Sequence, residues 1–235
     1  MSDPLTRITR RELLKLSPLL ALGAFAVPAW RDTLVEEGVR WSDGVSSAGY
    51  REGHAAPVYA NAEATPFEAF PYNYWDVADP GVDLDRWTLT VGGAVAHGGQ
   101  YTLDQIRALP RVTQNTRHVC VEGWDVIGRF GGARLRDFLA AAGADPAARF
   151  VTVTCADGYY ESIDIETARQ GQSLLCYEMY DQPLDRGHGA PLRLQLPTKL
   201  GYKQAKYLVT LDVTHVLPAR RGYWSDQGYS WHGGL

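Results

Sequence analysis

The sequence carries no surplus of positive charge and few cysteines, and it has no apolar run typical of a membrane-spanning helix. Its 235 residues include 23 Lys and Arg against 27 Asp and Glu, which gives a net charge of -4 at pH 7. Such a chain has no general attraction to nucleic acid or anionic lipid. The uncharged stretch from Leu16 to Trp30 is shorter than the roughly 20 apolar residues that a membrane-spanning helix needs. We therefore exclude nucleic-acid-binding proteins and multi-span membrane proteins.

Turn-forming residues are frequent, with 24 glycines and 13 prolines, which argues against a coiled coil or a helical bundle. Patterns of β-branched and alternating residues predict strands over residues 87–91, 151–154, 192–196 and 207–213. Helices are predicted over residues 102–109, 135–142 and 164–170, the first from a capping box at Thr102 and Gln105. Many short strands with few helices indicate the α+β class, as a strand-rich mixed α/β single domain.

The N-terminal residues 1–30 are typical of an export signal rather than of a folded domain. Arg10 and Arg11, followed by two leucines, Lys15 and the uncharged stretch, resemble a twin-arginine signal peptide. The alternative is an ordinary amphipathic helix. Because this kind of signal exports proteins that are already folded, it predicts a periplasmic protein that carries a cofactor. Residues 31–60 are expected to form an extended lead-in, and residues 61–235 the folded domain.

The three cysteines are Cys120, Cys155 and Cys176, and an odd number in an exported protein leaves at least one thiol without an internal partner. Cys155 and Cys176 lack a flanking motif and are expected to be core residues. Cys120 lies in the segment Arg117-His-Val-Cys-Val-Glu-Gly-Trp124. A thiolate is a soft ligand for a transition metal, and Arg117 is expected to favour its deprotonated form. The chain has no C-x-x-C pair, so another molecule would have to supply the remaining ligands.

Four segments resemble, in their order along the chain, the sulfite-oxidase family of molybdopterin enzymes. Cys120-Val-Glu-Gly-Trp124 is similar to the cysteine loop of the periplasmic protein-methionine-sulfoxide reductases of this family. The segment from Phe130 to Leu139 resembles the one that follows this cysteine in the oxidases. Gly189-Ala-Pro-Leu-Arg-Leu194 and Gly201-Tyr-Lys-Gln-Ala-Lys206 resemble the segments that bind the pterin phosphate. The resemblance implies a molybdopterin-binding domain of the sulfite-oxidase type.

The resemblance also implies a set of site residues for the molybdenum cofactor, Mo-molybdopterin. Cys120 matches the metal ligand and is therefore the expected catalytic residue. The expected cofactor-binding residues are Tyr72, Asn73, Tyr74, Trp75, Asp157, His188, Arg193, Gln204, Ala205 and Lys206. Arg193, Lys203 and Lys206 could together bind the phosphate dianion. His118 is expected to support the site rather than to bind the metal, and the aromatic residues after Tyr223 to pack over the domain, with one or two rings near the entrance.

A molybdenum centre of this kind moves an oxygen atom and two electrons between substrate and metal. A site that oxidises the sulfite dianion should present several arginines. The positions that hold arginine in the oxidases hold Asn73, Trp124 and Asp125 here, and an aspartate near the metal would repel sulfite. The sequence therefore favours reduction of a sulfoxide-type substrate, with sulfite oxidation as the alternative.

The chain has no C-x-x-C-H haem motif, so its electrons are expected to come from a separate partner, either a membrane haem protein or a soluble cytochrome. It also ends soon after the strand predicted over residues 207–213, without the immunoglobulin-like domain of dimeric sulfite oxidases, which predicts a monomer. Two alternatives from other classes remain. One is a metal-independent thiol enzyme with His118 as the base for Cys120, and the other is an exported binding module without catalysis.

Overall fold

The computed structural model describes residues 37–38, 41 and 55–235. The predicted signal peptide, residues 1–30, and most of the predicted lead-in lie outside the described residues. None of the described helices is long and apolar enough to cross a membrane. The last residues of the lead-in contact the domain, because Val58 forms a β-bridge with Thr116 and the Tyr59 amide donates to the Asn115 carbonyl at 3.0 Å.

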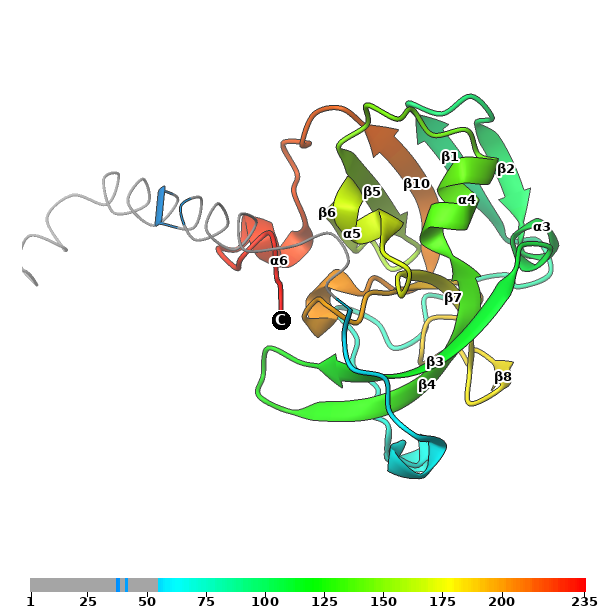
Figure 1. Ribbon diagram of the computed structural model, residues 1–235, viewed down its shortest axis with the longest axis vertical. Helices are drawn as coiled ribbons and strands as arrows, with labels where there is room; N and C mark the ends of the chain where they lie inside the picture. Colours follow the sequence, from blue (N-terminus) through cyan, green and yellow to red (C-terminus); the bar gives the residue numbers. More distant parts are fainter. Residues whose placement is uncertain (1–36, 39–40, 42–54) are drawn as a thin grey trace, which may run out of the picture.

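The domain contains two five-stranded sheets (Figure 1). The first has the order β2-β1-β10-β5-β6. Its strands are β1 (Thr88–Gly93), β2 (Gly99–Thr102), β5 (Phe150–Cys155), β6 (Tyr160–Asp164) and β10 (Leu208–Thr214). β1 and β10 pair in parallel although they are far apart in the sequence, whereas the other neighbours are antiparallel. Three of the four predicted strands are thus confirmed within this sheet.

The second sheet consists of β3 (Arg111–Val119), β4 (Asp125–Arg134), β7 (Leu174–Met179) and β8 (Gln182–Pro183), with β9 (Arg193–Gln195) paired to β7. β3 and β4 form a long antiparallel hairpin that runs along the lower edge of the molecule in Figure 1. Its tip is closed by the bond from the Cys120 amide to the Trp124 carbonyl at 2.9 Å. Gly123, at φ 94°, supplies the left-handed residue that this tight turn needs. The hairpin therefore holds Cys120 at its tip.

Short helices connect the strands, and three of them lie where the sequence predicts them. They are α3 (Leu103–Arg107), α4 (Leu135–Ala141), α5 (Ile165–Arg169) and α6 (Tyr223–Asp226), and the 3-10 turns are η1 (Asn61–Glu63), η2 (Phe67–Ala69) and η3 (Gly201–Lys203). The capping box at the start of α3 is present, since the Thr102 side chain accepts from the Gln105 amide and the Gln105 side chain bonds back to Thr102. The helices over 102–109, 135–142 and 164–170 are thus confirmed in slightly shorter form.

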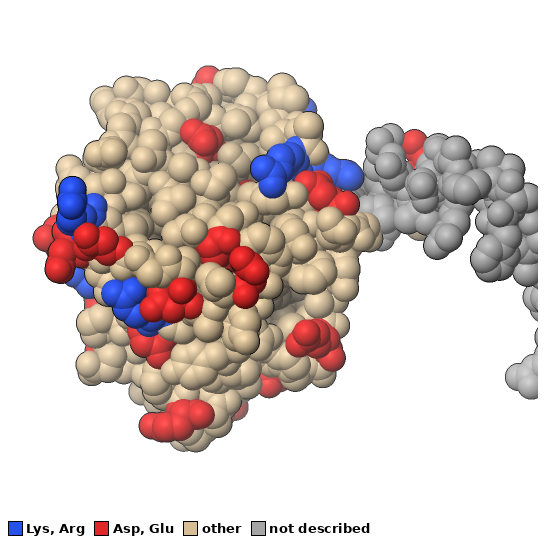
Figure 2. Space-filling model, turned by 180° about the vertical axis from the view of Figure 1, so that it is seen from behind, with Lys and Arg blue, Asp and Glu red and all other residues tan. Residues whose placement is uncertain are grey.

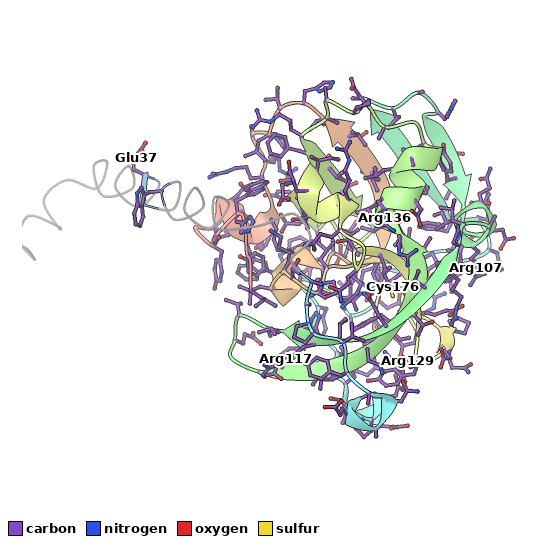
Figure 3. The ribbon with its side chains drawn as sticks, viewed as in Figure 1. Glu37, Arg107, Arg117, Arg129, Arg136 and Cys176 are labelled. Atoms are coloured by element: carbon purple, nitrogen blue, oxygen red, sulfur yellow. The ribbon has the colours of Figure 1, made fainter. Side chains whose placement is uncertain are left out.

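The main core lies on the first sheet, where Leu89, Val153 and Leu211 pack with Phe138 of α4. A second, smaller cluster around Phe130 and Leu174 lies on the second sheet. Cys155 belongs to the first cluster and Cys176 to the second, and both are buried free thiols, which confirms them as core residues. Figure 3 shows Cys176 inside the molecule, where burial raises the pKa of its thiol to about 11.

The strand predicted over residues 192–196 differs from its alternating pattern. β9 has three residues, and all three are buried. The reason is that both faces of β9 are covered, because Leu194 belongs to the main core cluster, whereas Arg193 lies over the Phe130 ring and Gln195 donates to Thr116 of β3. Arg193 is therefore enclosed in the protein rather than exposed on one face of a strand.

The C-terminal residues form a brace across the segment 198–206. The Leu200 amide donates to the Gly233 carbonyl at 2.8 Å, and the Leu235 amide to the Thr198 carbonyl at 3.0 Å. The Tyr202 hydroxyl donates to the Ser230 carbonyl at 2.7 Å. On the face in Figure 2, acidic and basic side chains are intermixed. The packing expected for the aromatic tail is confirmed, because Tyr223 and Trp224 pack against the main core and the Tyr229 ring lies 5.2 Å from that of Trp224.

Candidate functional site

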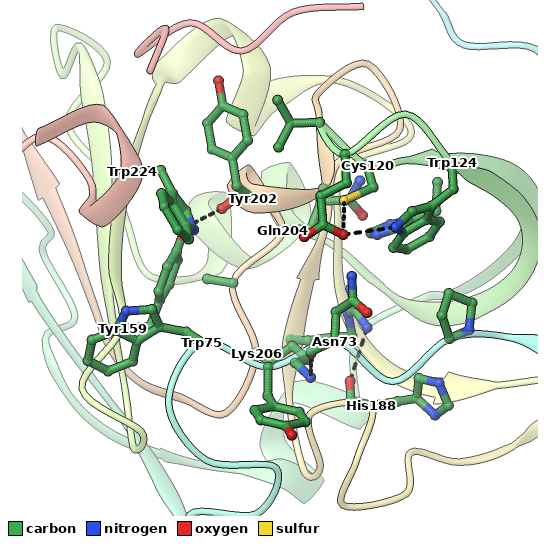
Figure 4. A pocket seen from close by; sticks show the side chains of 18 of the residues that line it. Asn73, Trp75, Cys120, Trp124, Tyr159, His188, Tyr202, Gln204, Lys206 and Trp224 are labelled. Carbon is green, nitrogen blue, oxygen red and sulfur yellow. Dashed lines mark hydrogen bonds between the residues drawn. The ribbon is translucent and has the colours of Figure 1, made fainter. Parts of the chain in front are cut away.

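The structure has an open cavity where loops from both sheets meet (Figure 4). The cavity is an open cleft, and its roughly 940 Å³ of empty space includes open solvent at the mouth. All the expected site residues except Tyr72 line it, namely Asn73, Tyr74, Trp75, Cys120, Asp157, His188, Arg193, Gln204, Ala205 and Lys206. Tyr72 instead stacks on His188, with the ring centroids 4.2 Å apart.

Cys120 reaches the cavity from the tip of the β3–β4 hairpin. Its Sγ atom lies 3.7 Å from the Glu122 Oε2 atom, which also accepts a hydrogen bond from the Trp124 indole at 3.1 Å. Burial, together with the Glu122 carboxylate, raises the pKa of the Cys120 thiol. No hydrogen bond joins Cys120 to His118 among the described contacts, so the alternative of a Cys120–His118 thiol enzyme lacks the contact that it needs.

Arg117 does not activate Cys120, contrary to the expectation from the sequence. Its guanidinium binds the Asp125 carboxylate with two bonds, at 2.8 and 2.6 Å, on the outer face of the hairpin (Figure 3). This pairing lowers the pKa of Asp125. Asp125 is also absent from the cavity wall, so the expectation that it would repel sulfite is wrong. The carboxylate next to Cys120 is that of Glu122.

Two cations, Arg193 and Lys206, line the cavity and bind only neutral groups. The buried Arg193 donates to the His188 carbonyl at 3.1 Å and to the Leu194 carbonyl at 3.4 Å. Lys206 donates to the carbonyls of Asn73 and Gly187, and burial lowers its pKa to about 8. Within residues 55–235 neither cation has a carboxylate partner. Because an unpaired buried charge is costly, this part of the cavity is suited to an anionic ligand.

Lys203, the third cation expected at the phosphate, takes no part in the cavity. Its ammonium group is buried and donates to Glu161 at 2.6 Å and to the Ser162 carbonyl at 2.9 Å. Burial raises the pKa of Glu161 to about 7, although the charge of Lys203 opposes this shift. Lys203 therefore stabilises β6 and η3 rather than binding a ligand.

Three buried polar atoms that belong to cavity residues have no hydrogen-bond partner. They are Nδ1 of His118, Nε2 of His188 and Oε1 of Gln204. Burial lowers the pKa of His118 to about 3, so its imidazole is neutral. Native proteins leave few buried polar groups unpaired, and a ligand with several hydrogen-bonding edges would satisfy these three together.

The remaining wall is aromatic and carries one further carboxylate. Asp157 accepts from the Tyr159 amide at 3.0 Å in a tight turn, and burial raises its pKa. Tyr159, Tyr202 and Trp224 also line the cavity, and the sequence did not single out the first two. Their positions, directly after the Asp157-Gly158 turn and within the Gly201–Lys206 motif, were the signals available. Trp224 confirms the expectation of a ring from the tail near the entrance.

The described residues contain no group of three or more His, Cys, Asp or Glu side chains arranged to hold a metal ion. Cys120 is a single potential donor, and the groups beside it are Glu122 and Trp124. The cavity thus combines one soft donor, two cations, three unpaired polar atoms and an aromatic wall.

Comparison with known proteins places this cavity in a family. The model of the oxidoreductase molybdopterin binding domain family matches residues 76–224. YedZ1 of Azospira oryzae, named as a protein-methionine-sulfoxide reductase subunit, is 45% identical over 181 residues, which cover 76% of this chain and 68% of that protein. The protein-methionine-sulfoxide reductase catalytic subunit MsrP of Xanthomonas axonopodis pv. citri is 30% identical over 151 residues, 57% of this chain. The match spans about half, 47%, of MsrP.

A solved structure has a similar fold. The sulfane dehydrogenase SoxCD from Paracoccus pantotrophus superposes with a TM-score of 0.54 at 19% identity, over 58% of this chain and 40% of that chain. The matched region contains Cys120 and all the cavity residues except those that precede it, namely Phe70, Pro71, Asn73, Tyr74 and Trp75. This chain belongs to the family of molybdopterin-binding oxidoreductases.

Proposed function

We propose that this protein reduces a sulfoxide to a sulfide, with Cys120 as the side-chain ligand of the molybdenum in its cofactor. The molybdenum cofactor, when bound, supplies oxygen-atom transfer coupled to two electrons. The reaction consumes a sulfoxide, two electrons and two protons, and gives a sulfide and water. The observation that carries the proposal is that Cys120 lines the same cavity as Arg193, Lys206 and the unpaired polar atoms.

The residues of the cavity fit the cofactor that the family binds. Arg193 and Lys206 would bind its phosphate, because both are cations that lack a carboxylate partner among the described residues. His188, Gln204 and Asp157 would bind the edges of the pterin, which need both donors and acceptors. We assign to Ala205, Asn73 and Tyr74 contacts along the same wall, and to Trp75 a place at its aromatic end.

The substrate assignment rests on the charge next to Cys120 and on the relatives. Glu122 places a carboxylate beside the sulfur, and the cavity cations lie on the wall assigned to the phosphate. A sulfite dianion would therefore meet repulsion at the metal, whereas a neutral sulfoxide would not. The names of YedZ1 and MsrP, both methionine-sulfoxide reductase subunits, favour the same choice.

We further propose that the protein works in the periplasm as a monomer, after export by the twin-arginine route, and takes its electrons from a separate haem protein. The paired arginines Arg10 and Arg11 support export. The relatives' names, which call each a subunit, support a separate partner.

The test is to purify the full chain from a host that makes molybdopterin and to measure metal content and two activities. We expect about one molybdenum per chain, reduction of methionine sulfoxide with a reduced viologen dye, and little oxidation of sulfite by ferricyanide. Cys120→Ser should lose both the metal and the activity, whereas Cys155→Ser is the control for removing a thiol. Rapid sulfite oxidation without sulfoxide reduction would reverse the assignment.

A further inference from the structure

His188 is held by a group of side chains that the family assignment does not explain. Its Nδ1 atom lies 2.9 Å from the Asp185 Oδ1 atom, and its amide donates to the same oxygen at 2.7 Å. The other oxygen of Asp185, Oδ2, accepts from the Tyr72 hydroxyl at 2.8 Å. Asp185 thus joins Tyr72, which lies outside the cavity wall, to His188, which lines it.

The packing around the ring leaves it little freedom. Tyr72 stacks on one face of the imidazole at 4.2 Å, and the Phe70 ring meets it edge to face at 5.3 Å. The Tyr72 ring in turn lies against Gly187, where a Cβ atom would come within 2.2 Å of the ring. The residue before His188 must therefore be glycine for Tyr72 to occupy this place.

These contacts decide which nitrogen carries the proton. An ionised carboxylate only accepts hydrogen bonds, so the bond to Asp185 requires a proton on Nδ1 of His188. Burial lowers the pKa of His188, and the nearby charges of Arg193 and Lys206 act in the same direction, although Asp185 opposes them. In the neutral ring with a proton on Nδ1, Nε2 is a hydrogen-bond acceptor. This is the buried atom that has no partner.

We infer that Tyr72 and Asp185 are positioning residues, which fix His188 in the tautomer that presents an acceptor to an N–H group of the bound heterocycle. The inference rests on the proposed cofactor site and adds two residues that hold His188, one of the members of that site. It also gives Tyr72 a role different from direct contact with the cofactor. Without Asp185, the His188 ring could carry its proton on Nε2. The Nε2–H group and the N–H group of the heterocycle would then be two donors facing each other.

The first measurement needs no cofactor. In the full-length apoprotein, labelled with 15N at histidine, the nitrogen spectrum separates the protonated from the unprotonated ring nitrogen. We expect His188 of the wild type to carry its proton on Nδ1, and Asp185→Asn to move a large share of it to Nε2. Tyr72→Phe keeps the stacked ring and removes one bond to Asp185, so its shift should be smaller. An unchanged tautomer in Asp185→Asn would overturn the inference.

The second measurement is a double-mutant comparison of molybdenum content after dialysis of the holoenzyme. Asp185→Asn should lower the content by roughly tenfold or more, as is common when the partner of a ligand-binding residue is lost. In a His188→Gln background, the side-chain amide has no ring tautomer. There, Asp185→Asn should lower the molybdenum content by less than about twofold. Asp104→Asn, at an exposed position on α3, is the matched control.

The outcomes separate the two proposals. Equal losses of metal in both backgrounds would show that Asp185 acts only on the fold, which overturns the positioning role. A wild-type protein that binds no molybdenum but holds its His188 proton on Nδ1 would contradict the proposed function and leave the tautomer assignment standing.

Discussion

The Sγ atom of Cys120 lies 3.7 Å from the Oε2 atom of Glu122, and the Trp124 indole holds that carboxylate in place. A negative charge therefore lies next to the sulfur proposed to bind the metal. Because Arg117 is bound to Asp125 on the outer face of the hairpin, no arginine of the hairpin tip offsets this charge.

Replacing Glu122 should change the selectivity for anions. In Glu122→Gln, sulfite should inhibit sulfoxide reduction at a concentration lower by roughly fivefold or more, because one charge at 4 Å is worth about 1 kcal/mol in water. The measurement is the inhibition constant of sulfite at low and high salt, and the difference should shrink as salt rises. Asp125→Asn is the matched control, since it removes the same charge outside the cavity. Equal effects of the two variants would contradict the role of Glu122.

Substitution of the two buried cations Arg193 and Lys203 should affect stability and cofactor content differently. Lys203→Met leaves Glu161 without its partner and should cost about 3–5 kcal/mol in the free energy of unfolding of the apoprotein. Arg193→Met removes an unpaired charge along with two hydrogen bonds, so its cost in the apoprotein should stay within about 1 kcal/mol. Cofactor content should nevertheless fall by at least about tenfold in Arg193→Met.

Urea unfolding of the apoproteins, together with metal analysis of the purified holoenzymes, measures both effects. An Arg193→Met apoprotein as unstable as Lys203→Met would show that the guanidinium serves the fold rather than the ligand.

Lys206 should make the stability of the apoprotein depend on pH in the alkaline range. Its pKa is lowered to about 8 by burial, whereas a lysine in an unfolded chain titrates near about 10.4. Between these values the unfolded chain binds a proton that the folded chain does not, so the free energy of unfolding rises with pH. Below pH 8 both states are protonated, and the penalty for the buried charge is present in full.

Comparing wild type with Lys206→Gln from pH 7 to 9.5 isolates this contribution, because the difference between their stabilities should change with pH in that range. A constant difference would show that Lys206 titrates alike in both states. In the holoenzyme the bound anion should stabilise the protonated amine and remove the effect.

The C-terminal brace should control cofactor retention. Deleting residues 229–235 removes the backbone bonds from Leu200 and Leu235 and the hydrogen bond from the Trp231 indole to Ser162. We expect amides in residues 199–206 to exchange roughly tenfold faster or more, because the segment loses its partners, and the metal content to fall in parallel. Trp231→Phe, which removes only the indole bond, should have a smaller effect. Unchanged exchange after the deletion would contradict the brace.

Local patterns predicted most of the regular structure. The capping box at Thr102, the helix over 135–142 and three strands of the first sheet, β1, β5 and β10, were predicted from the sequence, because each depends on neighbouring residues. β3 and β4 were missed because most residues of β3 are polar and β4 contains three glycines, so neither has the regular apolar alternation of a half-buried strand. β9 was predicted as an alternating strand, but the main core packs on one of its faces and β3 and Phe130 on the other, so every residue is buried.

The errors at the site have a single cause. Residues that are close to a site residue in the sequence were expected to be close to it in space, but the fold determines where their side chains lie. Arg117 lies three residues before Cys120 but pairs across the hairpin, where Val119 is opposite Asp125 and Arg117 opposite Ile127. Arg117 and Asp125 are thus diagonal neighbours on one face. Lys203 and Lys206 are equally close to the phosphate motif in the sequence, yet the η3 turn directs Lys203 toward Glu161. The chemical type of a side chain can be read from a sequence, but the direction in which the side chain points depends on the tertiary structure.

The bond from the Leu200 amide to the Gly233 carbonyl also sets an order of events during synthesis. Gln204, Ala205 and Lys206 follow Leu200 directly, so their segment gains its brace only when the chain through Gly233 has left the ribosome. Until Gly233 has emerged, a nascent polypeptide therefore presents an unfinished pocket.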